Sequence, residues 1–195
     1  MKGKLFFSAS IVLCVLFTLL FMSCYQTGKL GPLDWKLKDG TLTISGKGPM
    51  PNLKGYNSPW KGPIISVIIN DGVTTIGDYV FFEHNNLVSV SIPNTVTYIG
   101  SSAFKRCNNL YMITIPENVM LIGNEAFEDC GKLEIINILI NNPIQTDAFN
   151  RSLSKIFSRG TINNSILYVP PNTIEKYKAS GWDSFKNIRE GTGIQ

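Results

Sequence analysis

Apolar and polar positions in the middle of the chain follow a pattern that repeats every 23 residues. The stretch "LVSVSIPNTVTYIGSSAFKRCNN", residues 87–109, is followed at once by "LYMITIPENVMLIGNEAFEDCGK", residues 110–132. A fixed period of this size is typical of chains that stack one small structural unit many times. The pattern predicts a β-rich solenoid of about four such 23-residue units over residues 63–149.

The repeated apolar positions form columns when the units are aligned. These columns are Ile64, Leu87, Leu110 and Leu133; Val67, Val90, Ile113 and Ile136; Ile69, Ile92, Ile115 and Ile138; Ile76, Ile99 and Ile122; and Phe81, Phe104 and Phe127. No unit can bury its apolar side alone, so stacking like side chains on one another is the expected source of stability.

Each unit contains three recognisable segments. L-x-x-V/I-x-I alternates with period two and predicts a half-buried strand, closed by Pro93 or Pro116 where no ladder donor is needed. V-x-x-I-G predicts a second short extended piece, with the glycine making a tight corner. A-F-x-x-C predicts a brief helical turn. The fourth unit departs from the pattern, because its Ala148-Phe149 pair arrives one residue early and residues 150–165 form a partly helical insert without the repeat.

Non-repeating segments flank the units and predict covers for the two open ends. Residues 31–62 contain "WKLKDGTLTIS", a hairpin signature around Asp39-Gly40, and form the expected N-terminal β cap. Residues 166–190 predict a C-terminal cap: a strand, then a short helix from about Asn172 to Ala179. A tail, 191–195, follows.

The first 23 residues have the character of a secretory signal peptide. Lys2 and Lys4 precede an apolar run that ends at a small residue, and no charge lies between Leu5 and Cys24. A membrane-spanning helix is the alternative interpretation, because the run is nearly long enough. The sequence "LLFMSC" resembles a bacterial lipobox, which implies that Cys24 becomes the lipidated first residue; ordinary cleavage near Ser23 would instead give a free secreted protein. Residues 24–30 are expected to form a linker.

The charge balance argues against nucleic acid as a partner. Without residues 1–23 the chain has 16 basic and 14 acidic groups, and no basic run stands out. The expected membrane contact is through the lipid anchor.

The repeats resemble the BspA-type, or Treponema-type, leucine-rich repeat. "IPNTVTYIGSSAFKRCNNL" and "IPENVMLIGNEAFEDCGKL" carry the motif, and "LTISGKGPM…SPW" and "LYVPPNTIEKYKASGWDSFKNI" are similar to the caps that accompany it. The resemblance implies a leucine-rich-repeat stack in a secreted or surface-attached bacterial protein, of which some members are adhesins. It implies a cell-envelope location, here lipid-anchored to the outer membrane on its surface or its periplasmic face.

Two solvent-facing strand columns are the candidate binding surface for a protein or glycan ligand, since solenoids commonly bind on the concave strand face. The first column is Ser66, Ser89, Met112 and Ile135, and the second is Ile68, Ser91, Thr114 and Asn137. Met112 and Ile135 would form an adjacent apolar pair. These residues are also good strand formers, which is the simpler interpretation. A second apolar pair, Met120-Leu121, is expected on the opposite side.

The sequence offers little for catalysis. His84 is the only histidine and shares a repeat column with Cys107 and Cys130. A Cys107–His84 nucleophile pair would need a third, orienting group that the sequence does not place. No enzyme, cofactor or metal site is expected. Free buried thiols are the expectation for the two cysteines, with a disulfide between neighbouring units left open.

Overall fold

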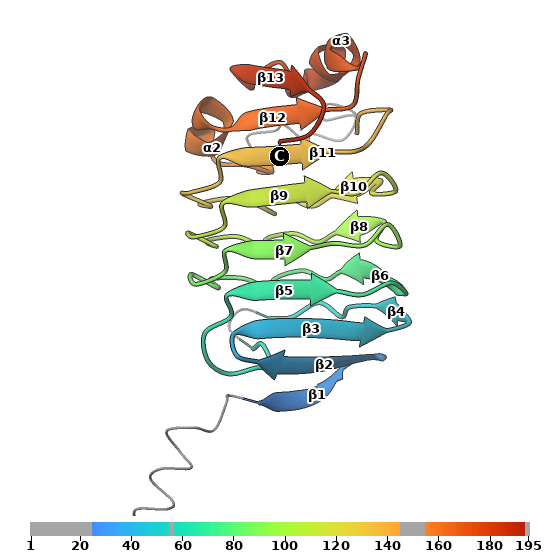
Figure 1. Ribbon diagram of the computed structural model, residues 1–195, viewed down its shortest axis with the longest axis vertical. Helices are drawn as coiled ribbons and strands as arrows, with labels where there is room; N and C mark the ends of the chain where they lie inside the picture. Colours follow the sequence, from blue (N-terminus) through green and yellow to red (C-terminus); the bar gives the residue numbers. More distant parts are fainter. Residues whose placement is uncertain (1–24, 55–56, 145–154, 194–195) are drawn as a thin grey trace, which may run out of the picture.

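The computed structural model describes residues 25–54, 57–144 and 155–193. Its main feature is a front ladder of strands stacked one above another (Figure 1). The front ladder consists of β1 (Gln26–Leu30), β2 (Leu33–Lys38), β3 (Thr41–Gly46), β5 (Ser66–Ile69), β7 (Ser89–Ser91), β9 (Met112–Ile115), β11 (Ile135–Ile138), β12 (Ile166–Val169) and β13 (Asn187–Glu190). β1, β2 and β3 are antiparallel, and the pairs from β3 to β7 and from β9 to β13 are parallel. A bond from Tyr111 N–H to Val88 O connects the β7 and β9 rungs.

A second, shorter ladder lies behind and beside the first. It consists of β4 (Gly48–Pro49), β6 (Val73–Ile76), β8 (Tyr98–Ile99) and β10 (Leu121–Ile122), all parallel. The rungs of β5, β7 and β9 therefore each have a strand from L-x-x-V/I-x-I in front and a short strand from V-x-x-I-G behind (β6, β8 and β10), as the alternation of branched residues predicts. The apolar columns lie between the two ladders and are buried, except for the half-buried Val90 and Ile92 of the β7 rung.

An aromatic column runs along the stack inside this core. Phe81, Phe104 and Phe127 stack with ring centroids 5.1 and 5.3 Å apart, and Trp60 covers the first of them at 5.8 Å. Phe157 continues the column at 5.4 Å from Phe127. The sequence predicted a segment without repeat character here, yet Phe157 fills the next rung 30 residues after Phe127, seven more than the repeat length. Phe149, the expected candidate, lies outside the described residues.

The A-F-x-x-C segments are turns, and the expected helical turn is absent from the three described copies. Each copy contains two left-handed residues four positions apart, such as Ser102 (φ 53°) and Arg106 (φ 62°). The amide groups alternate between two kinds of bond. Phe104 N–H donates to Ala126 O in the next rung at 2.8 Å, whereas Lys105 N–H and Cys107 N–H donate within the segment, to Ser102 O at 3.2 Å and Phe104 O at 3.1 Å. Every second amide of the segment bonds to the neighbouring rung, and these bonds fix the spacing of the rungs.

Glycine is needed after each back strand for a different reason from the tight corner that the sequence suggested. Gly77, Gly100 and Gly123 do not have the positive φ of a left-handed turn. A Cβ on Gly100 would lie 2.5 Å from Asp78 N and Gly77 C, the backbone of the preceding rung. The glycine is required because adjacent backbones approach closely at this position.

The N-terminal end begins earlier than the sequence suggested. Residues 26–30, expected to be a linker, form β1, which pairs with β2 along its whole length. The Gln26 side chain bonds the backbone of Lys61 in both directions, at 2.6 and 3.0 Å. The β2–β3 turn places Asp39 (φ 50°) and Gly40 (φ 77°) in the left-handed pair of a type I′ turn.

The C-terminal end contains three short helical segments and a final strand. α2 (Arg159–Asn164) lies within the predicted insert and starts at Ser158, whose hydroxyl accepts a bond from Thr161 N–H. α3 (Ile174–Tyr177) begins after Thr173, one residue later than expected, because Asn172 has φ 62°. The π-helical turn η2 (Lys178–Trp182) then leads to β13, and Trp182 and Phe185 are buried over the stack. None of the helices in the described part of the chain has the length and apolar character that crossing a membrane requires.

Candidate binding surfaces

The front ladder brings the predicted surface columns together in register. Ser66 pairs with Ser89 and Ile68 with Ser91, while Met112 pairs with Ile135 and Thr114 with Asn137. Ser89 donates a bond to the Ser66 hydroxyl at 3.1 Å. The columns extend onto β3 through Thr41 and Thr43. The predicted apolar pair of Met112 and Ile135 therefore exists as neighbouring side chains.

Exposure along the columns changes from one end of the stack to the other. Ser89, Ser91 and Ile68 are exposed, the last at 40%. Ser66, Met112, Thr114 and Ile135 are half-buried. Asn137, predicted to face solvent, is only 1% exposed.

The chain's own C-terminal tail covers Asn137. Gly193 N–H donates to Asn137 Oδ1 at 2.8 Å, and Asn137 Nδ2 donates to Thr114 Oγ1 at 3.3 Å. A Cβ on Gly193 would lie 2.7 Å from both Ile135 and Tyr168, so the glycine permits this close contact. In Figure 1 the tail leaves β13 and crosses in front of β12 toward β11. The tail thus removes part of the predicted surface from solvent.

The remaining part of the front ladder forms what we call the open face. Its members lie on β3, β5, β7 and β9: Thr41, Thr43, Ser66, Ile68, Ser89, Ser91, Met112 and Thr114. Hydroxyl groups dominate it, with Ile68 and Met112 as apolar exceptions. Hydroxyls can donate and accept hydrogen bonds, so this surface suits a polar ligand laid across several rungs.

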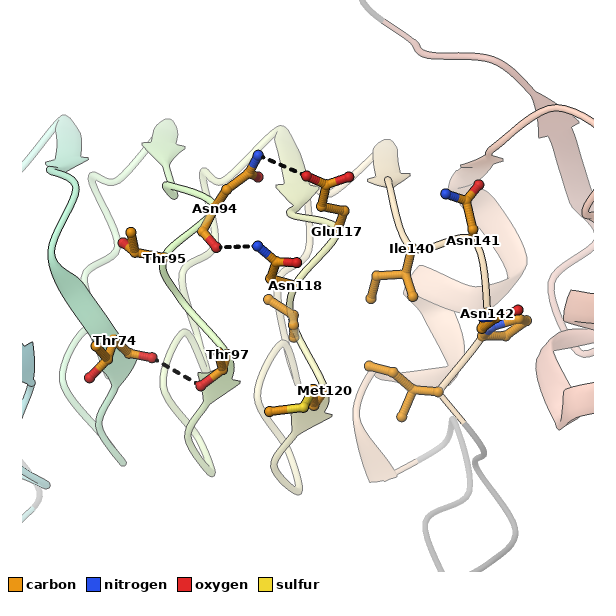
Figure 2. A pocket seen from close by; sticks show the side chains of 13 residues that line it. Thr74, Asn94, Thr95, Thr97, Glu117, Asn118, Met120, Ile140, Asn141 and Asn142 are labelled. Atoms are coloured by element: carbon orange, nitrogen blue, oxygen red, sulfur yellow. Dashed lines mark hydrogen bonds between the residues drawn. The ribbon is translucent and has the colours of Figure 1, made fainter.

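A second hollow, the back groove, lies next to β10 and has a volume of about 930 Å³. Figure 2 shows Thr74, Thr97 and Met120 following successive rungs on one side, with Ile140, Asn141 and Asn142 opposite. Asn94 Nδ2 donates to Glu117 Oε1 at 3.2 Å, and Asn118 Nδ2 donates to Asn94 O at 2.9 Å (Figure 2). Met120 is 72% exposed.

Of the back groove, sequence reasoning found only Met120; Leu121, the other member of the predicted pair, is half-buried in β10 and does not line the groove. Most polar residues of its walls lie in loops after the front strands, and Thr74 lies on β6. Their recurrence every 23 residues, as in Thr74 and Thr97, is the one signal that could have indicated a shared surface.

The His84 imidazole has both nitrogens occupied. Nε2 accepts from Trp60 Nε1–H at 2.8 Å, which leaves Nδ1 to donate to Phe82 O at 3.1 Å. Burial lowers the pKa of His84 below its ordinary value, against smaller opposing effects from backbone hydrogen bonds. The ring is therefore held neutral as a structural bridge between the N-terminal end and the first rung.

The two cysteines are free, buried and one rung apart. Cys107 Sγ donates to Phe81 O and Cys130 Sγ to Phe104 O, each at 3.1 Å. Burial raises the pKa of Cys107 well above its usual value and that of Cys130 to about 12. Both groups stay protonated at neutral pH, whereas a cysteine nucleophile acts as the thiolate. The described geometry thus gives no support to a Cys107–His84 nucleophile pair.

Residues 60–156 match the family model described as "BspA type Leucine rich repeat region (6 copies)". The protein is a BspA-type leucine-rich repeat protein. The matched range begins at Trp60, which covers the aromatic column, and ends one residue before Phe157. Repeats of this family are typical of protein-interaction or surface modules, and leucine-rich repeats are generally non-catalytic.

Solved bacterial leucine-rich repeat proteins show similarity to the BspA-type chain. A protein from Eubacterium ventriosum is 26% identical over 58% of this chain, with a TM-score of 0.44, and the match spans 44% of that protein's length. A Treponema pallidum leucine-rich repeat protein is 20% identical over 58% of this chain and 68% of its own, with a TM-score of 0.32. A leucine-rich cell surface protein from Faecalibacterium prausnitzii is 19% identical over 86% of this chain and 55% of its own, with a TM-score of 0.34. No curated protein matches the chain.

Charged side chains link successive BspA-type repeats along one edge. Lys105 Nζ lies 2.7 Å from Glu125 and 2.5 Å from Glu128 in the next repeat. These hydrogen bonds raise the pKa of Lys105, and the bond from Lys105 lowers that of Glu125. Arg106 spans the repeats on either side, from Glu83 at 2.6 Å to Asp129 at 3.6 Å. In the described residues, no group of histidine, cysteine and acidic side chains is arranged to hold a metal ion.

Proposed function

We propose that this BspA-type protein is a non-catalytic, lipid-anchored protein of the bacterial cell envelope that binds a protein or glycan through its open face. The observation that carries the proposal is the uncovered run of strands from β3 to β9: polar side chains are in register on β3, β5 and β7, and Thr114 adds a further hydroxyl on β9. Successive strands repeat such side chains at a backbone separation of about 4.8 Å, and the hydroxyls of the neighbours Ser66 and Ser89 lie 3.1 Å apart. A ligand that spans several rungs could bond to each of them.

The anchor half of the proposal rests on the lipobox-like "LLFMSC" and Cys24. Acyl chains on one cysteine bury many methylene groups at about 0.8 kcal/mol each, enough in combination to hold a domain on a membrane. Radioactive palmitate labelling of cells that express the protein tests this half. Label is expected in the native protein and not in Cys24→Ala; label that persists in the variant would remove the anchor.

The binding half is tested by screening immobilised matrix proteins and glycans against the purified protein. Once a ligand is found, Ser89→Arg and Ser91→Arg should weaken its binding at least tenfold, because each introduces a long charged side chain in the middle of the open face. Asn124→Arg is the matched control, since Asn124 is exposed in a turn outside the front ladder. Equal affinity for all three variants would place the site elsewhere on the molecule.

A second candidate is a structural or assembly component on the periplasmic side, with no host ligand. The observation that favours it is the tail over Asn137 and Ile135, which reduces an already short strand surface. Protease treatment of intact cells separates the two candidates. Digestion on intact cells supports surface display, whereas protection until the outer membrane is opened supports the assembly role.

A further inference from the structure

Positive charge is concentrated at the end of the stack where the described chain begins. Residues 25–63 contain six lysines and two aspartates, whereas residues 64–195 contain ten basic and twelve acidic groups. All six lysines are exposed: Lys29, Lys36, Lys38, Lys47, Lys54 and Lys61. The net charge of +2 for residues 24–195 (16 basic and 14 acidic groups) therefore combines a basic end with a weakly acidic remainder.

The basic end has a defined geometry on the outermost strands. Lys36 and Lys38 project from the exposed side of β2 and border a hollow of about 430 Å³ with Asp39 and with Thr41 and Thr43 of β3. Lys29 of β1 pairs with Asp34 of β2 at 2.6 Å, so Lys36 and Lys38 carry the excess positive charge of these strands. Lys36 Nζ lies 5.3 Å from the centre of the Tyr25 ring, which is 58% exposed. Tyrosine and lysine together suit the boundary between lipid headgroups and water.

The start of β1 places this end close to the proposed anchor. β1 begins at Gln26, so only Tyr25 separates the strand from Cys24. Two residues span at most about 7 Å of extended chain. Lysines on β1 and β2 would then lie within about one Debye length, roughly 8–10 Å, of a bilayer that holds the Cys24 lipid.

We propose that the β1–β2 end is a docking surface for an anionic phospholipid bilayer. Docking of this end orients the stack with β13 pointing away from the membrane (Figure 1). Thr41 and Thr43, the β3 end of the open face, then lie at the contact, and the part of the open face on β5, β7 and β9 lies along the side of the stack. The inference rests on the proposed lipid anchor, which provides the tether, while the lysines and Tyr25 provide the contact. Lysines on an outer strand can also serve only to prevent edge-to-edge pairing of sheets. If the lysines only prevent edge-to-edge pairing, their reactivity should not depend on the charge of the lipid.

The experiment uses the mature lipidated protein on two kinds of vesicle. One is phosphatidylcholine alone, and the other contains about one-third phosphatidylglycerol. Flotation with each vesicle reports attachment, and amine-reactive labelling read by mass spectrometry reports the accessibility of each lysine. Labelling of Lys36 and Lys38 is expected to fall about fivefold on the anionic vesicles and to recover at about 1 M salt, where the Debye length is about 3 Å. Lys176 and Lys186, exposed near the other end of the stack, should keep their reactivity.

Two double variants test whether charge causes the protection. In Lys36→Gln/Lys38→Gln, protection of Lys29 and Lys61 on anionic vesicles should weaken severalfold. The matched Lys176→Gln/Lys186→Gln variant removes the same charge and should leave that protection unchanged. Loss of protection in both variants, or in neither, would overturn a docking role for the β2 lysines.

The outcomes separate failure of the docking from failure of the anchor. Flotation on both vesicles with equal labelling of Lys36 and Lys38 overturns the docking and keeps the anchor. Flotation on anionic vesicles alone overturns the anchor and keeps the docking. Protection that is equal on neutral vesicles means that tethering alone shields the lysines, and it overturns the charge-based contact.

Discussion

Phe104 shows how a single residue carries the stacking of this fold. Its ring is fully buried between Phe81 and Phe127, with centroid separations of 5.1 and 5.3 Å. Phe104→Ala removes contacts on both sides and leaves a cavity, so the free energy of unfolding should fall by about 3–5 kcal/mol. Equilibrium unfolding in urea measures the change. Phe82→Ala, at a half-buried neighbour, is the control and should cost clearly less; equal costs would contradict the role of the column.

Burial of His84 makes the stability of the protein fall as the pH falls. Burial lowers the pKa of the folded-state imidazole, so the unfolded chain takes up the proton first as pH falls. The contribution of His84 to the free energy of unfolding is complete at pH values above its pKa in the unfolded chain, about 6.5. It is lost as the pH falls through the lower pKa of the folded state. Unfolding in urea at a series of pH values between about 7.5 and 5 should show this loss.

His84→Gln is the matched variant for that measurement. The glutamine amide oxygen can accept the Trp60 Nε1–H bond but has no proton to gain in this range. The variant's free energy of unfolding should depend less on pH than that of the native protein. Identical pH profiles would show that His84 does not titrate as its buried position indicates.

Residue spacing explains which parts of the aromatic column could be predicted. Phe81, Phe104 and Phe127 are separated by the repeat length, so alignment alone brings them together. Phe157 joins the same column only because seven additional residues precede it, and a fixed period cannot register an insertion. The front strands could be predicted for the same reason, because their alternation of apolar and polar residues recurs in each repeat.

At the scale of elements, the back strands depend on how closely one rung approaches the next. A Cβ at Gly100 would lie 2.5 Å from the backbone of the rung below, whereas one at Gly131 would meet nothing within 4 Å. Gly100→Ala should therefore separate β8 from β6 and lower the free energy of unfolding by about 1–3 kcal/mol. Gly131→Ala, the same change at an open position, should be within about 0.5 kcal/mol of the native protein. Thermal unfolding compares the two, and equal effects would contradict the close-approach argument.

The turns after the back strands show that local sequence alone does not determine whether a segment forms a helix or a turn. A-F-x-x-C has helical composition, yet Ser102 and Arg106 adopt left-handed conformations and the amide of Phe104 bonds to the next rung. The local sequence indicates which conformation a segment prefers by itself. It does not indicate that Ala126 O, which accepts the bond from Phe104 N–H, lies 22 residues further along the chain. Tertiary pairing therefore decides the conformation.

At the scale of the whole molecule, contacts between distant segments decide what remains exposed. The bond from Gly193 to Asn137 joins residues 56 positions apart, and the tail has no periodic signal that would predict it. β1 was missed for a similar reason, since "QTGKL" is short and polar and becomes a strand by pairing with β2. The repeats, the β2–β3 hairpin, β12 and the short helix after it could be predicted from sequence, whereas β1, β13 and the covered part of the binding surface could not.

Two truncations distinguish the tail from the end cover. Deleting residues 191–195 removes the Gly193 contact, so Asn137 and Ile135 should gain exposure at a stability cost of about 1 kcal/mol. Deleting residues 174–195 also removes β13 and the buried Tyr177, Trp182 and Phe185, and it leaves β12 as an open strand beside the exposed end of the core. This variant should lose cooperative unfolding and associate, because an uncovered repeat exposes its shared interior. Urea denaturation measures the stability and cooperativity of each variant, and sedimentation velocity measures its association. If the 174–195 deletion stays monomeric and unfolds cooperatively, the stack needs no cover. If the 191–195 deletion is insoluble, the tail has a structural role in place of a surface one.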